Sequence, residues 1–346
     1  MKVKAESLLR LAPCRPTVAV LWILLWGLAF SPLSARSQSC QTSGELEDTT
    51  RTSITSAGQR YFDMAAKADV ASLKLNAIPT LAADFSAVEA TVKDHQKDFA
   101  GAQGTVKSAF LLETEGATPA PHAEFYCGVF GKNGQTSGSA VFAFDNLPPG
   151  KYAVVLLDAT SPPGRSMFSV ILQMIAAEWK LGDLYIKPAQ VAGHDSDWFL
   201  ARAREYKTRG QTHNAWFSYV VARNLISPLA RMSTLATDKL YDESQSVRPA
   251  DLPFDGKTVD LVAGTAIYKV TAVFPEVVGN DLDLIVKYQA ADISNTNQAY
   301  QNDIAVIKAV VAKYPEIRDA FAAVVARAVD PTGHDYGAML PMKDIK

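Results

Sequence analysis

The stretch GHDSD at residues 193–197 is the best candidate for metal or acid–base chemistry, because it places His194, Asp195 and Asp197 within four positions. A zinc site needs three or four protein ligands, and no HxH or HxxxH pair elsewhere in the sequence would anchor the others. Serine and aspartate are also the residues that most often cap a helix. We therefore predict that Asp195 or Ser196 caps a helix, with Asp197 stabilised in its first turn by the helix dipole, and that no metal binds here.

Other catalytic patterns in the sequence are incomplete. There is no GxSxG nucleophile elbow. The run GAQGTVKS at 101–108 imitates a phosphate-binding loop, but Val106 stands where the motif requires glycine before Lys107. No cofactor is predicted. We interpret three further histidines, which lie in polar or turn segments, as solvated or capping residues: His95, His213 and His334.

The first 37 residues are typical of a secretory signal peptide. Four basic residues precede an apolar run at 18–30, and Ala35 and Ser37 supply the small residues that signal peptidase requires. The run is shorter than the roughly 20 apolar residues of a spanning helix. We predict a signal peptide over 1–37, cleavage after Ser37, and an exported chain that is periplasmic or extracellular.

Removal of residues 1–37 leaves 309 residues with 29 basic and 35 acidic side chains, so the net charge of the mature chain is near −6. No long basic run survives, and nucleic acid is therefore not an expected partner. No second apolar stretch approaches membrane length, so no membrane span is expected in the mature chain. The expected partner is another protein or a small molecule.

The exported chain keeps two cysteines, Cys40 and Cys127. In an oxidising compartment they can form a disulfide. The alternative is a free thiol in a flexible N-terminal segment and a buried thiol in a strand. A lipid anchor on Cys40 is disfavoured, because Ser37 stands where lipoprotein signals normally carry an aliphatic residue.

Residues 44–188 predict helices followed by strands. Apolar residues from about Gly44 to Gly101 follow a helical period, and Pro79 suits the first turn of the later helix. From 105 to 188 the pattern changes to six strand-like runs separated by turn-forming residues. Strands so close in sequence are expected to pair as an antiparallel meander. The predicted class is α+β, with helices on a curved antiparallel sheet.

This order of elements resembles the nuclear-transport-factor-like fold, a cystatin-like cone of helices on a bent sheet. The run EWKLGDLYIKP at 178–188 is similar to the Trp-bearing last strand of that family. The resemblance implies a pocket between the sheet and its helices, which relatives use for catalysis, small-molecule binding or dimerisation. A fold shared by so many activities leaves the function open.

A pocket of this kind could support proton transfer between a carboxylate base and a tyrosine donor, as in ketosteroid isomerase. The candidate catalytic residues are Asp158, Tyr126 and Tyr152, which lie on or beside predicted strands. Asp158 also directly precedes the turn ATSPPG, where a turn-forming aspartate is the ordinary expectation.

Residues 195–247 predict a central helical segment. After the linker AQVAGHDSD the sequence resembles a tetratricopeptide hairpin, in which small residues let two antiparallel helices approach and aromatic residues fill the space beside them. Gly210 supplies the turn, and Arg202 and the late Pro228 depart from the motif. A further helix is predicted over residues 228–247. The matching positions are Phe199, Ala203, Tyr206, Ala215, Tyr219 and Ala222.

Four aromatic residues of this segment are candidate binding residues: Trp198, Tyr206, Trp216 and Tyr219. Trp198 and Trp216 lie outside the packing positions of the motif. They therefore either cover neighbouring domains or line an exposed groove that could hold a peptide or another protein.

Residues 254–346 predict a smaller C-terminal α+β module. The strand-like runs KTVDLVA, TAIYKVTAVF and DLDLIVKYQA are joined in part by VVGND, which predicts a hairpin. Two helical patterns follow, the first capped by Asn295 or Ser294 and the second beginning at Pro315. The second pattern is lined by Ile317, Phe321, Val324, Val325 and Ala328.

These observations favour an exported, non-enzymatic binding or assembly protein made of three modules. An exported hydrolase or isomerase that uses the pocket of the cone is the alternative. A third hypothesis is that the cone mainly forms a homodimer.

Overall fold

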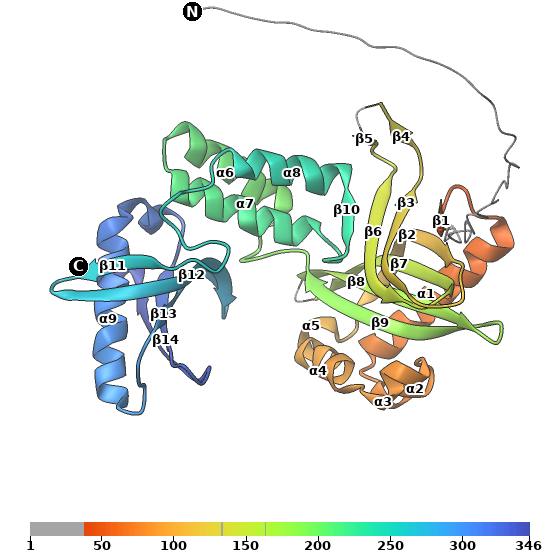
Figure 1. Ribbon diagram of the computed structural model, residues 1–346, viewed down its shortest axis with the longest axis horizontal. Helices are drawn as coiled ribbons and strands as arrows, with labels where there is room; N and C mark the ends of the chain where they lie inside the picture. The colour runs from red at the N-terminus through yellow and green to blue at the C-terminus, as the bar shows by residue number, and fades with distance from the viewer. Residues whose placement is uncertain (1–37, 133, 163) are drawn as a thin grey trace, which may run out of the picture. The chain divides into compact units, whose positions relative to one another are not determined.

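The computed structural model describes residues 38–132, 134–162 and 164–346 (Figure 1). The predicted signal peptide lies outside the described residues. As predicted, the fold class is α+β, with separate antiparallel sheets in the first part, a pair of packed helices, and a C-terminal mixed sheet with its own helix.

The first part of the chain is built on a five-stranded antiparallel sheet. Adjacent strands are joined by hairpins from β7 onward, and β7 lies at the centre. In spatial order the strands are β1 (Gln38–Thr42), β2 (Gln103–Thr114), β7 (Gly150–Ser161), β8 (Gly164–Ile175) and β9 (Glu178–Pro188).

Helices cover one face of this sheet, as expected. Alternate residues of β7, among them Val155 and Leu157, point into the shared core of helices and sheet. Gly58 lets the longest helix approach closely, since a Cβ there would lie 2.6 Å from a methyl carbon of Val155. The predicted helix after Pro79 is interrupted at Asp84. The helices are α1 (Asp48–Ala66), α2 (Val70–Leu75), α3 (Pro79–Ala83), α4 (Ser86–Asp94) and α5 (Gln96–Phe99).

A second, three-stranded sheet covers the opposite face, and the expected single meander is therefore wrong. The strand β2 pairs with β7, whereas β3 (Ala120–Cys127) pairs with β6 (Ala140–Leu147) and β6 with β10 (Met232–Thr234). The physical reason is that β7 is apolar on both faces, so its second face also needs a cover. Between β3 and β6 the chain forms the short pair β4 (Phe130–Gly131) and β5 (Gly134–Gln135).

A disulfide between Cys40 and Cys127 joins the two sheets at β1 and β3. Of the two alternatives that the sequence left open, the structure shows the disulfide. The alternative of a flexible segment around Cys40 is wrong, because Cys40 lies in β1 opposite Leu112 of β2. A sulfur bonded to Cys127 is also not available to carry a lipid.

The central helical segment contains α6 (Ser196–Thr208), α7 (Thr212–Ile226) and α8 (Leu235–Gln245). Gly210 adopts φ +74° in the turn between the first two helices. The small and aromatic residues that match the hairpin motif are buried together between the helices. The helix expected directly after Pro228 is wrong in its first part, because the chain first forms β10 and then enters α8 through a capping box at Thr234.

A polar network around the buried Tyr219 ties these three helices together. The hydroxyl of Tyr219 donates to Glu243 (2.7 Å), which also accepts two hydrogen bonds from Arg204 (2.7 and 2.8 Å). These bonds and the charge of Arg204 hold the pKa of Glu243 at about 2. The carboxylate is therefore charged at neutral pH and joins α8 to both α6 and α7.

The C-terminal part is a five-stranded mixed sheet in the order β11-β12-β13-β14-β15 with α9 (Thr296–Lys313) packed against it. Asn295 caps α9, as predicted. The predicted hairpin is also confirmed, because Val278 pairs with Asp281 around a Gly-Asn tip. The strands are β11 (Val259–Ala263), β12 (Ala266–Val278), β13 (Asp281–Gln289), β14 (Ala323–Val329) and β15 (Asp335–Pro341), and η2 (Met342–Asp344) follows.

The predicted second helix of this part is wrong. Pro315 begins only a short 3-10 turn, η1 (Pro315–Asp319), and the apolar run after it is β14, parallel to β13. Val324 and Ala328 fit one stripe of a helix, but they also fit the alternation of a strand that is buried between two neighbours. His334 is exposed, as interpreted, and the stretch directly after it forms the edge strand β15.

Asp303 of α9 is buried in the core of the C-terminal part. One of its oxygens accepts a hydrogen bond from the hydroxyl of Tyr288 on β13 (2.8 Å). The other, Oδ2, is buried, and among the described residues no side-chain partner bonds to it. Burial raises the pKa of the Asp303 carboxyl from 3.8 to about 6.

Because the folded-state pKa of Asp303 is raised, its stabilising contribution is complete below pH 4 and is lost as the pH rises through about 6. Asp303→Asn cannot titrate, so its stability should fall less between pH 4 and pH 7 than that of the wild type. The difference expected for a shift of about two units is about 3 kcal/mol. Urea unfolding across this pH range, with the exposed Asp94→Asn as the control, tests this; parallel profiles for wild type and Asp303→Asn would contradict it.

Candidate functional site

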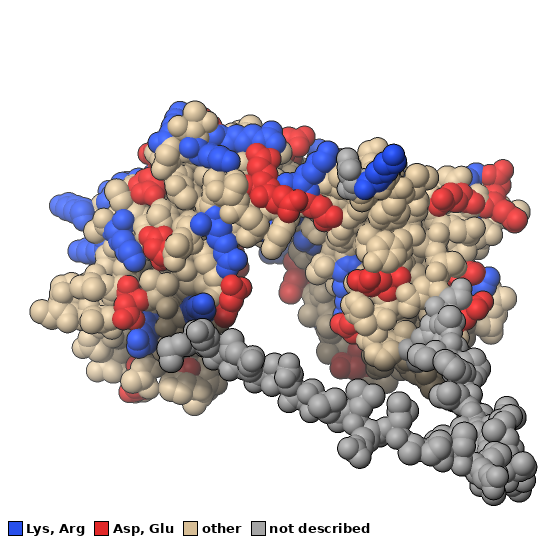
Figure 2. All heavy atoms as spheres, turned by 45° about the horizontal axis from the view of Figure 1, so that its top comes forward, with Lys and Arg blue, Asp and Glu red and all other residues tan. Residues whose placement is uncertain are grey.

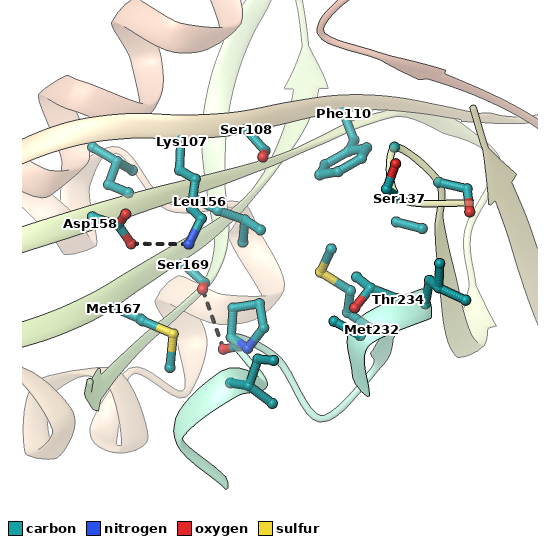
Figure 3. A pocket seen from close by; sticks show the side chains of 18 of the residues that line it. Lys107, Ser108, Phe110, Ser137, Leu156, Asp158, Met167, Ser169, Met232 and Thr234 are labelled. Carbon is teal, nitrogen blue, oxygen red and sulfur yellow. Dashed lines mark hydrogen bonds and ion pairs between the residues drawn. The ribbon is translucent and has the colours of Figure 1, made fainter. Parts of the chain in front are cut away.

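A cavity of about 590 Å³ lies between the five-stranded sheet and the elements that cover its second face, the sheet β10-β6-β3 and α8. Residues of β2, β7 and β8 form one wall, and residues of β6, β10, α8 and the segments beside them form the other. Figure 3 shows labelled side chains from both walls around one common space. The cavity is therefore on the face of the sheet opposite the helices, whereas the cone resemblance implied a pocket beneath the helices. The helix side is filled by the first hydrophobic core.

An irregularity in β2 places polar side chains on the wall that the five-stranded sheet forms. The pairing of β2 with β7 shifts between Val106 and Ser108, which leaves Lys107 as an extra residue. Lys107 and Ser108 therefore both line the cavity, although consecutive residues of a regular strand point to opposite faces. The Lys107 ammonium lies 3.6 Å from the carboxylate of Asp158 on β7 (Figure 3).

The rest of the sheet wall is apolar. Leu156 stands opposite Ser108 on one side and Ser169 of β8 on the other. Phe110, two residues after Ser108 on β2, also lines the cavity. The hydroxyl of Ser169 donates to the carbonyl of Pro228 (3.3 Å), so this buried polar group is satisfied across the two walls.

The second wall is held in place by bonds to the chain that connects α7 to β10. The ammonium of Lys187 on β9 donates to the carbonyls of Asn224 (3.0 Å) and Ser227 (2.7 Å) at the end of α7. Burial lowers the pKa of Lys187. A cation at a helix C-terminus is favourable because it opposes the helix dipole. Met232 and Leu235 then face the cavity from β10 and α8.

The chemistry available in the cavity is limited. Its ionisable lining residues are Lys107, Asp158 and Lys239, and the described lining residues include no histidine, cysteine, glutamate or tyrosine. Ser108 and Ser137 add hydroxyl groups. No nucleophile therefore has a histidine base beside it, and the arrangement is better suited to holding a largely apolar molecule by one polar end.

The structure separates the three candidate catalytic residues. Asp158 lines the cavity, but Tyr152 is buried six residues away along β7, about 20 Å at the spacing of a strand. The hydroxyl of Tyr152 donates to the carbonyl of Pro148 (2.8 Å). Tyr126 is 59% exposed on β3, and its hydroxyl donates to Glu124 (2.8 Å). Neither tyrosine can therefore act as the proton donor that would work together with a base at Asp158.

Of the four candidate binding aromatics, three are core residues. Tyr206, Trp216 and Tyr219 are all buried. The hydroxyl of Tyr206 donates to the carbonyl of Asp319 (2.8 Å), and the ring of Trp216 packs in the core of the C-terminal part. Trp198 is 40% exposed and lines a second cavity of about 210 Å³.

The cluster at 193–197 begins a helix, as predicted. The carboxylate of Asp195 accepts a hydrogen bond from the backbone N–H of Trp198 (3.1 Å), and Asp197 lies in the first turn of α6. The ring of His194 stacks on Trp198 with centroids 3.8 Å apart. Within the described ranges no group of three or more His, Cys, Asp or Glu side chains is arranged to hold a metal ion.

The sequence reasoning missed most of the cavity wall. Lys107 belonged to a rejected loop motif, and Met232 and Lys239 were placed on one long helix with no assigned role. The only readable signal was the long apolar run of β7, which indicates a strand buried on both faces.

On the face shown in Figure 2, acidic and basic side chains are interspersed.

Comparisons with protein-family models, with curated proteins and with solved structures give no match. In the part of the chain that the structure describes, none of the helices has the length and apolar character needed to span a membrane.

Asp195→Ala removes the cap of α6 and should lower the free energy of unfolding by about 1 kcal/mol. Asp195→Asn keeps an oxygen that can accept from the Trp198 N–H, so it should cost much less. Urea unfolding of the two variants measures the difference. Equal losses in both variants would contradict a capping role and point to a need for the negative charge.

Proposed function

We propose that the chain is an exported binding protein that holds a small, largely apolar molecule between its two sheets in the first part of the chain. The observation that carries this proposal is the cavity of about 590 Å³, whose size is within the range of small-molecule sites. Its walls combine apolar side chains with a few polar groups, which is the usual composition of such sites.

The side chains of the interior support the same proposal. Met167 and Met232 line the cavity from opposite walls, together with Phe110 and Leu156. Methionine side chains are flexible and adapt to ligands of different shape. The enclosing strands are fixed by the Cys40–Cys127 disulfide and by the pairing of β10 with β6. The ligand would therefore enter a largely pre-formed space.

Export is part of the proposal. A disulfide between Cys40 and Cys127 is consistent with an oxidising location. The features of the first 37 residues favour a signal peptide, with cleavage directly before the first described strand, β1.

The two family resemblances and the three-module division remain hypotheses. A helix-covered antiparallel sheet is compatible with a nuclear-transport-factor-like origin, and the buried small residues between α6 and α7 are compatible with a tetratricopeptide-like hairpin. The proposed boundaries are 44–188, 195–247 and 254–346. Under this division the central hairpin contributes to function by carrying β10 and α8, which form one wall of the cavity.

An exported hydrolase or isomerase is the second candidate, and one observation favours it: Asp158 and Ser108 both line the cavity, so a carboxylate and a hydroxyl are exposed to the same space. If Asp158 is a base, Asp158→Asn should abolish turnover in a screen of ester and ketosteroid substrates without lowering the melting temperature. Turnover retained by this variant would remove Asp158 as the base.

Ala236→Trp tests the binding proposal, because Ala236 lines the cavity at an exposed position of α8. The neutral fluorophore N-phenyl-1-naphthylamine should bind the wild type with enhanced emission, and the indole at 236 should weaken binding at least tenfold by filling the space. Asp242→Trp is the matched control, since it adds an indole to an exposed position of α8 that does not line the cavity. Equal affinity in Ala236→Trp and Asp242→Trp would contradict the proposed location.

A further inference from the structure

We propose that the ligand of this cavity is an anionic amphiphile with a single acyl chain, whose charged head is bound by Lys107 and Lys239. This inference rests on the proposed function and specifies the class of molecule that the same site takes. It follows from the charges at the polar end, the shape of the interior and the position of the two lysines on different walls.

The cavity carries an excess positive charge. Of its three ionisable lining residues two are lysines and one is an aspartate. The pair between Lys107 and Asp158 is loose, since its nitrogen and oxygen are 3.6 Å apart and both side chains remain partly exposed. For Lys239 the described residues provide no hydrogen bond or ion pair. One full positive charge is therefore free to meet an anion.

Lys239 lies on the same helix face as the apolar residues that α8 contributes to the second wall. It is four residues after Leu235 and three after Ala236 on α8, so the three side chains share one face of the helix, and all three line the cavity. A ligand that covers Leu235 with a hydrocarbon chain would therefore bring its polar end to the ammonium of Lys239.

Lys107 faces the same space from the other wall because of the irregularity in β2. A regular strand would have pointed it to the helix-covered face of the sheet. The hydroxyl groups of Ser108, next to Lys107 in the chain, and of Ser137, across the cavity, also line it and can donate to a polar head. Lysine ammonium groups from both walls, together with neutral hydroxyl donors, are the groups that bind a carboxylate or phosphate head.

The interior suits a flexible chain. Two sheets that pack face to face lie about 10 Å apart, and side chains normally fill the space between them. Where some of those side chains are missing, a flat space remains between the sheets. Phe110, Leu156, Met167 and Met232 surround it. A single acyl chain can follow such a space, and the two methionines can adjust to its length.

The test compares twelve-carbon ligands that differ only in their head: dodecanoate, dodecyl phosphate, dodecanol and dodecyltrimethylammonium. Each is titrated against N-phenyl-1-naphthylamine bound to the purified protein. A charge-assisted bond contributes about 1.5–3 kcal/mol, so at least one anionic ligand should bind about tenfold or more tightly than dodecanol. Tighter binding of dodecanoate or of dodecyl phosphate would then identify the head as a carboxylate or a phosphate.

The double variant Lys107→Met, Lys239→Met keeps the apolar stems and removes both charges. It should lose the preference for the anionic ligand and keep the affinity for dodecanol. Lys308→Met, on the exposed surface of α9, is the matched control and should behave as the wild type. Melting temperatures of the variants establish that each is folded.

The outcomes separate the two proposals. Equal binding of dodecanoate, dodecyl phosphate and dodecanol, or preference for the cationic ligand, would overturn the inference and leave the binding function standing. An anion preference that survives the double variant would also overturn it. If neither the fluorophore nor any twelve-carbon ligand binds, both the inference and the proposed function fail.

Discussion

The central constraint on the first part of the chain is that β7 is buried on both faces. Its residues from Tyr152 to Leu157 are buried without interruption. Because successive side chains of a strand point to opposite faces, both sides of the five-stranded sheet must be removed from water. The five helices before β2 cover one side, and the sheet β10-β6-β3 covers the other. The three-stranded sheet covers this second side incompletely, and the uncovered part is the cavity. The proposed site is therefore a consequence of how the five-stranded sheet is enclosed.

Two sets of interactions hold the three-stranded sheet in place against the five-stranded sheet. On one side the Cys40–Cys127 disulfide joins β1 to β3. On the other side β10 pairs with β6, and Lys187 binds the end of α7 just before the chain enters β10. The central hairpin is consequently more than a spacer, because the segment that leaves it supplies one wall of the cavity.

Local patterns predicted most of the elements. The alternation and turn residues between 105 and 188 correctly predicted the long strands of the first part, and Asp195 and Asn295 cap their helices as expected. These features depend on neighbours in sequence. The pairing of β3 with β6 and the disulfide geometry depend on segments that are far apart, which no local pattern specifies. The same limit explains β14, whose short apolar run fits both a helix and a buried strand.

The candidate site was predictable only in part. Asp158 lines the cavity, but the predicted pocket lay between the sheet and its helices, whereas this cavity lies on the opposite face of the sheet. Tyr152 lies six residues away along β7, and Tyr126 is on the outer surface. Lys107 could not be found in this way, because its position depends on a shift in the pairing of β2 with β7.

The most direct test of the account is the response of the methionine methyl groups to N-phenyl-1-naphthylamine, followed by carbon-13 methyl NMR. Met167 and Met232 line the cavity from its two walls, whereas Met339 is exposed on β15 at the C-terminal edge. The account predicts saturable shifts of both the Met167 and the Met232 signals, with that of Met339 unchanged. A shift of Met339 while Met167 and Met232 stay fixed would place the ligand elsewhere and contradict a binding site between the sheets.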